Sequence, residues 1–361
     1  MPHPLIDSIA AHAQMFVKLR RELQLSSERA MADWRTGDLV AGRLEQWGYK
    51  LDRRVGGNGI VAQLRRGSGS KRLGLRADMG ALLQPAAAAG GRFGHTAMLL
   101  AAAHYLARQG DFSGTLNLVF QCADPHEGGA HRMVADGLFD RFPCDAIFAM
   151  HGVAGQPQGR LLLRDGPAMA SHDDVSITLH GDPLHGVADP VVAGAAIVMG
   201  LQSIAARPME PQQMVAVQVS GFEAKAVSQA ATLQLGVRAL DRDVRDDLQR
   251  RITALAELQA LSYGVRATVD YRHHAPVLCN SPLETEFARQ LAMELLGPGQ
   301  VQTQTQAAAF AGHDDFAFML EQVPGSYLLL GNGDGPAQDF NEANLPIGAA
   351  YWAMLAQCYL H

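Results

Sequence analysis

The sequence has no block of lysine or arginine residues. Its 30 basic and 36 acidic residues are spread along 361 positions and give a formal charge of -6 at neutral pH. Proteins that bind nucleic acid or an anionic membrane surface usually carry clustered positive charge. The charge pattern therefore argues against both partners, and we expect the chain to bind small molecules and further copies of itself.

Cysteine and long apolar runs are also scarce. The four cysteines lie far apart and form no Cys-x-x-Cys pair, which favours a reducing compartment over a disulfide scaffold. No uncharged apolar run reaches the roughly 18 residues typical of a membrane span. The first 14 residues lack the basic start and apolar core of a signal peptide. These absences predict a cytoplasmic protein with no membrane segment.

Two common catalytic motifs are missing as well. There is no Gly-x-Ser-x-Gly sequence, which excludes the nucleophile elbow of serine hydrolases. The one glycine-rich run, "GNGDG", lies late in the chain without the strand and helix that a dinucleotide site requires.

The sequence does contain an alternation of strand-like and helix-like segments. "KRLGLRADM", "GTLNLVFQ" and "DAIFAMHG" are typical of buried strands, and "GHTAMLLAAAHYLARQG" and "GAHRMVADGLF" are typical of helices. This order predicts an α/β domain with a mostly parallel sheet covered on both faces. Ligands of such sheets bind at the carboxyl ends of the strands. Asp78, Asp124 and His151 all lie at such ends, so we expect them to be close together.

The pattern changes near Ser171. From there to about residue 278, two successive strand, helix, strand units predict a separate α+β domain. We therefore expect a first domain formed by residues 1–170 and 279–361, with a second domain, 171–278, inserted into it.

Several segments together resemble a known family. They are "GLRADM", "GHTAMLL", "MHG", "GPAMAS", "LQSIAAR", "PGSYLLLG" and "DFNEANLPIGAAYW". The chain is similar to the metal-dependent amidohydrolases of the M20 peptidase clan, in the branch of hippurate hydrolase and the indole-acetyl amino acid hydrolases. The resemblance implies a zinc-peptidase-like (phosphorylase/hydrolase-like) catalytic domain with an inserted α+β lid domain that also forms a homodimer.

The resemblance also implies zinc or manganese ions, which polarise the amide carbonyl and activate water, and a glutamate as general base. The family's thiolate ligand corresponds here to Gly90, and its first imidazole ligand corresponds to Arg92. The paired glutamates correspond to Asp124 and Pro125. The last histidine ligand falls near Asp334, where the sequence has no histidine.

Of the five ligand positions, only His151 keeps a usable side chain. A catalytic zinc normally has three protein ligands. We therefore expect no metal cofactor and no metal-dependent hydrolysis.

The resemblance also indicates residues that bind substrate. His185 matches a family histidine that reaches the partner's active site, and Lys225 replaces an asparagine that contacts the substrate carboxylate. Together with Arg92 they predict a positive lining that binds an N-acyl amino acid or a similar small carboxylate or amide. Asp124, His151 and His185 are the candidate catalytic residues of a metal-independent reaction.

Two alternatives stay open from the sequence. His126, Glu127 and His151 are the candidate ligands of a rebuilt metal site in an active amidohydrolase. The chain is alternatively a non-catalytic partner of an active relative. The equivalent of His95 is not a ligand in the family, so we interpret this histidine as structural.

Overall fold

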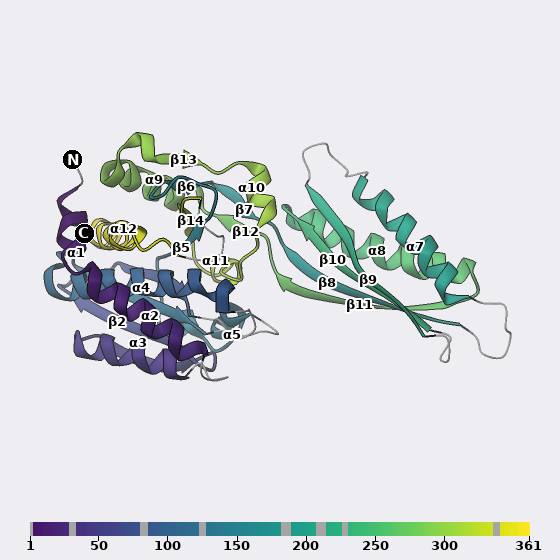
Figure 1. Cartoon of the computed structure of the whole chain (residues 1–361), viewed down its shortest axis with the longest axis horizontal. Helices are drawn as coiled ribbons and strands as arrows, with labels where there is room; N and C mark the ends of the chain where they lie inside the picture. Colours follow the sequence, from purple (N-terminus) through teal and green to yellow (C-terminus); the bar gives the residue numbers. More distant parts are fainter. Residues whose placement is uncertain are drawn as a thin grey trace. The chain divides into compact units, whose positions relative to one another are not determined.

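The computed structural model describes residues 3–28, 34–79, 86–122, 128–181, 189–206, 214–225, 230–334 and 340–361. The chain divides into two compact units (Figure 1). The first unit contains Met1–Gly166, Cys279–Gln304 and Phe318–His361, and the second contains Pro167–Leu278 and Thr305–Ala317.

The first unit is built on an eight-stranded sheet with the order β1-β2-β4-β3-β5-β14-β6-β13. The strands are β1 (Lys50–Val55), β2 (Gly59–Arg66), β3 (Arg72–Asp78), β4 (Gly114–Gln121), β5 (Ala146–Val153), β6 (Leu161–Leu163), β13 (Val301–Thr303) and β14 (Gly325–Gly331). The four central strands β4, β3, β5 and β14 are parallel. Antiparallel pairs flank these four strands on both sides, and β6 and β13 at one edge are again parallel, so the predicted parallel arrangement is found in the centre and at this edge.

The central strands are apolar because helices cover the sheet. All seven residues of β14 are buried, as are the first five of β5. The helices of this unit are α1 (Pro4–Ala10), α2 (Ala13–Glu28), α3 (Trp34–Gln46), α4 (Ala86–Gln109), α5 (Gly129–Ala135), α6 (Leu138–Arg141), α9 (Pro282–Leu296), α11 (Ala317–Leu320) and α12 (Asn344–Tyr359), with a 3₁₀ turn at Pro298–Gln300.

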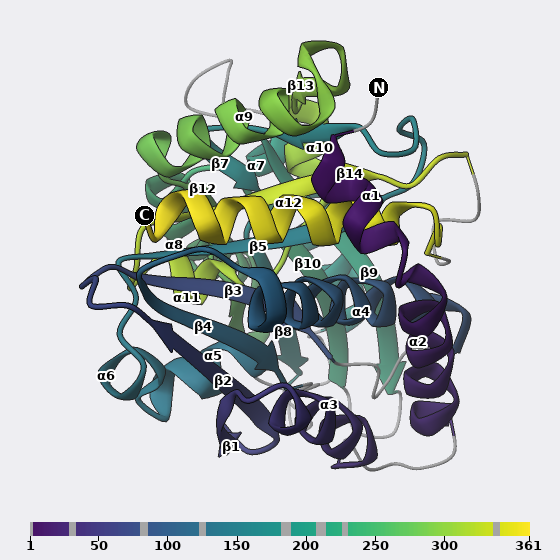
Figure 2. The ribbon, with the colours of Figure 1, turned by 90° about the vertical axis from the view of Figure 1, so that its left-hand side faces the viewer.

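Helices α4 and α12 pack side by side over the sheet (Figure 2). The contacts of α4 with β3 and β5 fix this helix above the central strands. Phe93 on α4 and Tyr351 and Trp352 on α12 are among the largest fully buried side chains. From Phe93 onwards, α4 is therefore held against the sheet by the main core of the unit.

The second unit is a four-stranded antiparallel sheet with the order β11-β8-β10-β9, and two helices cover one face (Figure 1). Its elements are β8 (His172–His180), α7 (Pro190–Ala206), β9 (Val215–Lys225), β10 (Ala230–Ala239), α8 (Arg242–Ser262) and β11 (Arg266–Ala275). Val175, Ile177 and Leu179 alternate along β8 and are buried under the helices. The predicted α/β fold with an inserted α+β domain is confirmed.

Short elements occur where the chain passes between the units. They are β7 (Gly166–Met169), β12 (Leu278–Asn280) and α10 (Gln306–Ala311). Among the described helices, none combines the length and the apolar character needed to cross a bilayer.

Candidate active site

The carboxyl ends of the four central strands lie at one edge of the sheet because β4, β3, β5 and β14 run parallel. Asp78 ends β3, Gln121 ends β4, and His151 lies near the end of β5. Asn332 directly follows β14. This edge therefore collects polar side chains from strands that are distant in the sequence, as expected for a ligand site in such a sheet.

Two imidazoles form the centre of the described part of this edge. The ring of His151 is half-buried, and its centroid lies 4.5 Å from that of His95 on α4. His95 is only 3% exposed, and its Nε2 accepts a hydrogen bond of 2.7 Å from the backbone N–H of Gly152. The lone pair of His95 Nε2 is thus engaged by the backbone, so the proton of a neutral ring resides on Nδ1. This geometry agrees with the structural role predicted for His95.

His151 also neighbours an aromatic ring. The centroid of Tyr327 on the adjacent strand β14 lies 6.4 Å from that of His151, and the two rings are stacked. On the other side, the ring of Phe340 meets that of His95 edge to face at 6.2 Å. The imidazole pair is therefore held in place by two aromatic side chains.

A buried charge lies beneath the site. Arg76 on β3 is 4% exposed, and its Nε donates a hydrogen bond of 2.8 Å to Oε1 of Gln121. The backbone carbonyl of Asp78 accepts a hydrogen bond from the hydroxyl of Thr96 at 3.2 Å. These bonds connect β3, β4 and α4 at the level where the strands end.

A network of amides fixes the chain that follows β14. The backbone N–H of Asn332 donates to the carbonyl of Val153, and Oδ1 of Asn332 accepts from the backbone N–H of Asn341, both at 2.8 Å. Nδ2 of Asn344 donates to the carbonyl of Gly331 at 2.8 Å, and Oδ1 of Asn344 accepts from Gln158 at 2.8 Å. The sequence analysis did not identify these residues. For Asn341 and Asn344, the only signal in the sequence is the segment "DFNEAN".

Of the residues predicted to lie at these strand ends, the structure describes Asp78, which ends β3 and is partly buried, and His151. Asp124, Pro125, His126, Glu127 and His185 lie outside the described residues. Arg92 lies in α4 and Lys225 ends β9, but their side chains are also outside the description. The predicted grouping of His151 with the other candidates therefore stays a prediction.

A metal does not fit the residues that are described. Within the described ranges, no group of three or more His, Cys, Asp or Glu side chains could hold an ion. His151 has His95 beside it, but Nε2 of His95 already accepts the backbone N–H of Gly152.

Comparison with known proteins identifies the family. Residues 83–357 match the model of peptidase family M20/M25/M40. The chain is 33% identical over 383 aligned positions to the hippurate hydrolase of Campylobacter jejuni, with 99% of each chain covered. It is 27% identical to an N-acetyl-L-cysteine deacetylase of Bacillus subtilis, over 89% of this chain and 81% of the relative. The chain belongs to the M20 peptidase family.

Solved structures agree with this fold. A dinuclear metal-binding peptidase of the M20 family from Bacillus subtilis matches with a TM-score of 0.81 at 24% identity, over 97% of this chain and 99% of the other. An aminobenzoyl-glutamate utilization protein from Klebsiella pneumoniae matches with a TM-score of 0.72 at 22% identity, over 98% of each chain. The two units thus have the fold of an M20 catalytic domain with its inserted lid domain.

Proposed function

We propose that this protein binds an N-acyl amino acid or a similar small carboxylate or amide and has lost the metal-dependent hydrolysis typical of its family. The observation that carries the proposal is the sequence at the ligand positions, where glycine, arginine and proline stand at residues 90, 92 and 125. None of these side chains donates an electron pair to a cation, and Arg92 brings a permanent positive charge. The names of two relatives, hippurate hydrolase and N-acetyl-L-cysteine deacetylase, support a small amide as ligand.

In this proposal, positive side chains recognise the ligand's carboxylate. Arg92 binds it with two parallel hydrogen bonds, which a planar guanidinium offers and a metal ion does not. Lys225 and His185 are the further side chains of the proposed positive lining. Asp124, His151 and His185 are the groups that would move protons if a metal-independent reaction takes place.

His151 is the acid-base candidate whose surroundings are described. His151 itself is paired with Leu329 of β14, and β5 is also paired with β3 as far as Ala149, so the backbone that carries the imidazole is fixed. The engaged Nε2 of His95 cannot accept a proton from a ligand without losing its bond to Gly152. We therefore assign any proton transfer at this pair to His151.

A second candidate function is that of an active amidohydrolase with a rebuilt metal site. The 33% identity to a hippurate hydrolase over nearly the whole length of both chains favours it. Its ligands would be His126, Glu127 and His151, and this set keeps three side chains of types that bind zinc or manganese.

Hippurate is the probe that separates the candidates. We expect calorimetry to show hippurate binding that weakens at least about tenfold in Arg92→Ala, because a charge-assisted bidentate contact is lost. Arg65→Ala is the matched control, since Arg65 is exposed on β2. We expect no release of glycine with or without added Mn²⁺ or Zn²⁺.

Other outcomes would contradict the proposal. Glycine release that needs added metal and disappears in Glu127→Ala supports the active amidohydrolase. If the protein neither binds nor hydrolyses hippurate, the third function remains, that of a non-catalytic partner of an active relative.

We further propose a homodimer formed through the second unit, acting as a lid. Helix α7 has no charged residue in Pro190–Ala206, although it forms an outer layer of this unit. Its inner face, with Ile197 and Leu201, is buried on the sheet, whereas Met199 is 72% exposed and Val192 49% exposed. An uncharged surface helix with exposed apolar side chains is typical of an interface. The dispersed cysteines support a cytoplasmic location for this dimer.

A further inference from the structure

Helices α2 and α3 form a groove on the first unit, here called the α2–α3 groove. It lies between residues 14–22 of α2 and two residues at the end of α3, Arg43 and Trp47, and its volume is about 310 Å³. Both helices contact α4 as well as each other, so the first unit alone builds the groove (Figure 2). Pockets that bind small molecules have volumes of about 300 to 1,000 Å³. The groove is therefore large enough for a small substituted ring.

The floor of the α2–α3 groove is apolar. Phe16 and Leu19 of α2 line it and belong to the buried core of the unit. Met15 beside them is 40% exposed, and Trp47 is half-buried. Small-molecule sites are lined mainly by apolar and aromatic side chains, and an exposed methionine adapts its shape to different ligands. The floor therefore suits a flat apolar ring.

A tight helix end places Trp47 in the groove. The backbone N–H groups of Gly48 and Tyr49 donate to the carbonyls of Glu45 and Leu44, each at 3.1 Å. This is the Schellman pattern of a helix end, which requires a left-handed residue. Gly48 provides it with a φ of 87°. The backbone that carries the indole is therefore fixed by the sequence Trp-Gly-Tyr.

Two neighbouring rings hold the indole itself. The ring of Trp47 meets that of Phe16 edge to face, with centroids 6.2 Å apart, and that of His104 on α4 in the same way at 5.1 Å. His104 and Phe16 are buried. A ligand that contacts the indole therefore restricts little further side-chain motion, which favours binding.

The rim of the α2–α3 groove carries a net positive charge. Its charged residues are Lys18, Arg43 and Glu22. Nη2 of Arg43 lies 4.0 Å from Oε2 of Glu22, and these side chains are 42% and 54% exposed, so their ion pair is weak. Lys18 is exposed and takes part in no ion pair with the described part of the chain. The rim therefore offers positive charge to an anion.

We propose that the α2–α3 groove is a binding site for a small aromatic carboxylate. The aromatic ring packs against the indole of Trp47 and the side chain of Met15, and the carboxylate pairs with Lys18 and Arg43 at the rim. A cationic ligand would be repelled by the net charge, and a neutral one would gain nothing from it. The groove shares no residue with the strand edge that carries His151, so the inference is independent of the ligand or reaction proposed there.

Tryptophan fluorescence of the full-length protein tests the groove, with benzoate as the probe. We expect a saturable change of the emission, with a Kd of about 1 mM or lower. Trp47→Phe should remove this change, because the indole at the groove is the reporter.

Reversing the rim charge is the second part of the test. Lys18→Glu should weaken benzoate binding at least about fivefold. The matched control is Arg35→Glu: Arg35 is an exposed cation of α3 outside the groove, and its replacement should keep the affinity at about 0.15 M salt, where distant charges are screened. Benzamide, which has the same ring without the charge, should also bind at least about fivefold more weakly than benzoate.

Three outcomes would overturn the proposal. They are a benzoate signal that persists in Trp47→Phe, equal affinities in Lys18→Glu and Arg35→Glu, and an emission that does not change up to about 10 mM benzoate. Lys18 is exposed, so Lys18→Glu still decides the question if Trp47→Phe does not fold. None of these outcomes bears on the proposed active site, which hippurate binding to the Arg92→Ala variant tests separately.

Discussion

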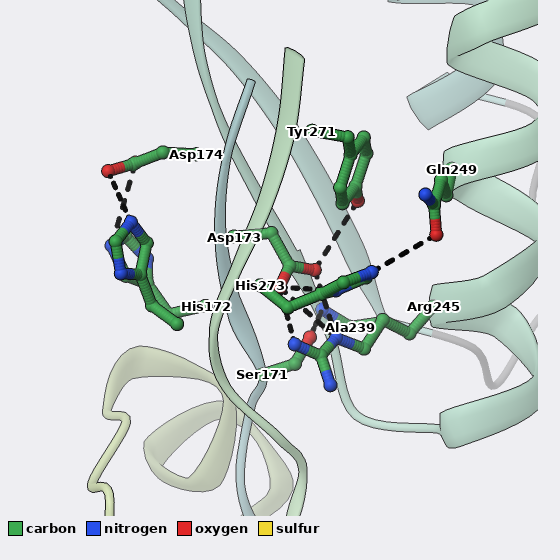
Figure 3. Close-up of polar contacts among 10 residues, drawn as sticks. Ser171, His172, Asp173, Asp174, Ala239, Arg245, Gln249, Tyr271 and His273 are labelled. Atoms are coloured by element: carbon green, nitrogen blue, oxygen red, sulfur yellow. Dashed lines mark hydrogen bonds and ion pairs between the residues drawn. The ribbon is translucent and has the colours of Figure 1, made fainter. Parts of the chain in front are cut away.

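Among the residues of the second unit that the structure describes, Asp173 is the most deeply buried charge. Its side chain is completely buried and accepts hydrogen bonds from Nε and Nη2 of Arg245, the shortest of them 2.5 Å (Figure 3). The hydroxyl of Tyr271 lies 3.3 Å and Nδ1 of His273 3.1 Å from the same carboxylate. Burial and this carboxylate both raise the pKa of Tyr271, so the phenol stays protonated and donates. Asp173 thus joins β8, β11 and α8.

Replacing Asp173 should therefore destabilise the second unit strongly. We expect Asp173→Asn to lower the free energy of unfolding by about 3 kcal/mol, because Arg245, whose side chain is only 13% exposed, is left without a counter-charge. Asp270→Asn on β11 is the control: its pair with Arg272 is exposed and should contribute less than about 1 kcal/mol. Hydrogen exchange of β8 and β10 amides measures both. Similar losses in the two variants would contradict the assigned role of Asp173.

At the level of elements, the close packing of helix α4 beside the site requires a glycine at position 94. A Cβ added at Gly94 would overlap the ring of Phe340, which is itself buried and lies edge to face with His95. The overlap begins at the base of the ring, so the side chain cannot simply swing away. The absence of a side chain at position 94 therefore allows the close packing beside the imidazole pair.

Gly94→Ala should therefore change the stability in the opposite direction to an ordinary glycine-to-alanine substitution in a helix. Glycine to alanine inside a helix usually stabilises by about 1 kcal/mol, whereas overpacking costs about 1–3 kcal/mol. We expect Gly94→Ala to lower the melting temperature and Gly42→Ala in α3, where nothing lies near the added Cβ, to raise it. Thermal unfolding measures both. A stabilised Gly94→Ala protein would show that Phe340 moves aside.

The main elements could be predicted from the sequence because their patterns are local. "GTLNLVFQ" and "DAIFAMHG" are β4 and β5 almost to the residue. The pattern failed where glycine changes the backbone. "GAHRMVADGLF" predicts one helix, but Gly137 has a positive φ of 78° and separates α5 from α6. Helix α4 begins at Ala86, before Gly90 and Gly91, two residues that disfavour helix on local grounds.

The site could be predicted only in part. His151 could be singled out because it lies near the end of a strand whose first five residues are buried. The bond from Gly152 to His95 and the contact of Asn332 with Asn341 depend on tertiary packing, which no local pattern encodes. The stack of His172, His274 and His313 likewise joins three segments that are far apart in the sequence.

For the whole molecule, the proposed dimer makes a direct prediction. A charge placed on the outer face of α7 should separate the copies, because burying an unpaired charge in an apolar interface is costly. We expect light scattering to show a dimer for the natural protein and a monomer for Met199→Arg. Leu283→Arg on α9 is the control, since Leu283 is 81% exposed in the first unit and should leave the dimer intact. A monomeric natural protein would contradict the proposed interface.

The metal content of the whole protein tests the proposed loss of hydrolysis most directly. The protein is incubated with Mn²⁺ or Zn²⁺, desalted without chelator and measured by elemental analysis, with the dinuclear metal-binding M20 peptidase of Bacillus subtilis treated in parallel. Because the proposal assigns Gly90, Arg92 and Pro125 to ligand positions of the family, we predict far less than one ion per chain for this protein and stoichiometric metal for its relative. One or two tightly held ions per chain, removed by chelator together with hippurate hydrolysis, would contradict the prediction.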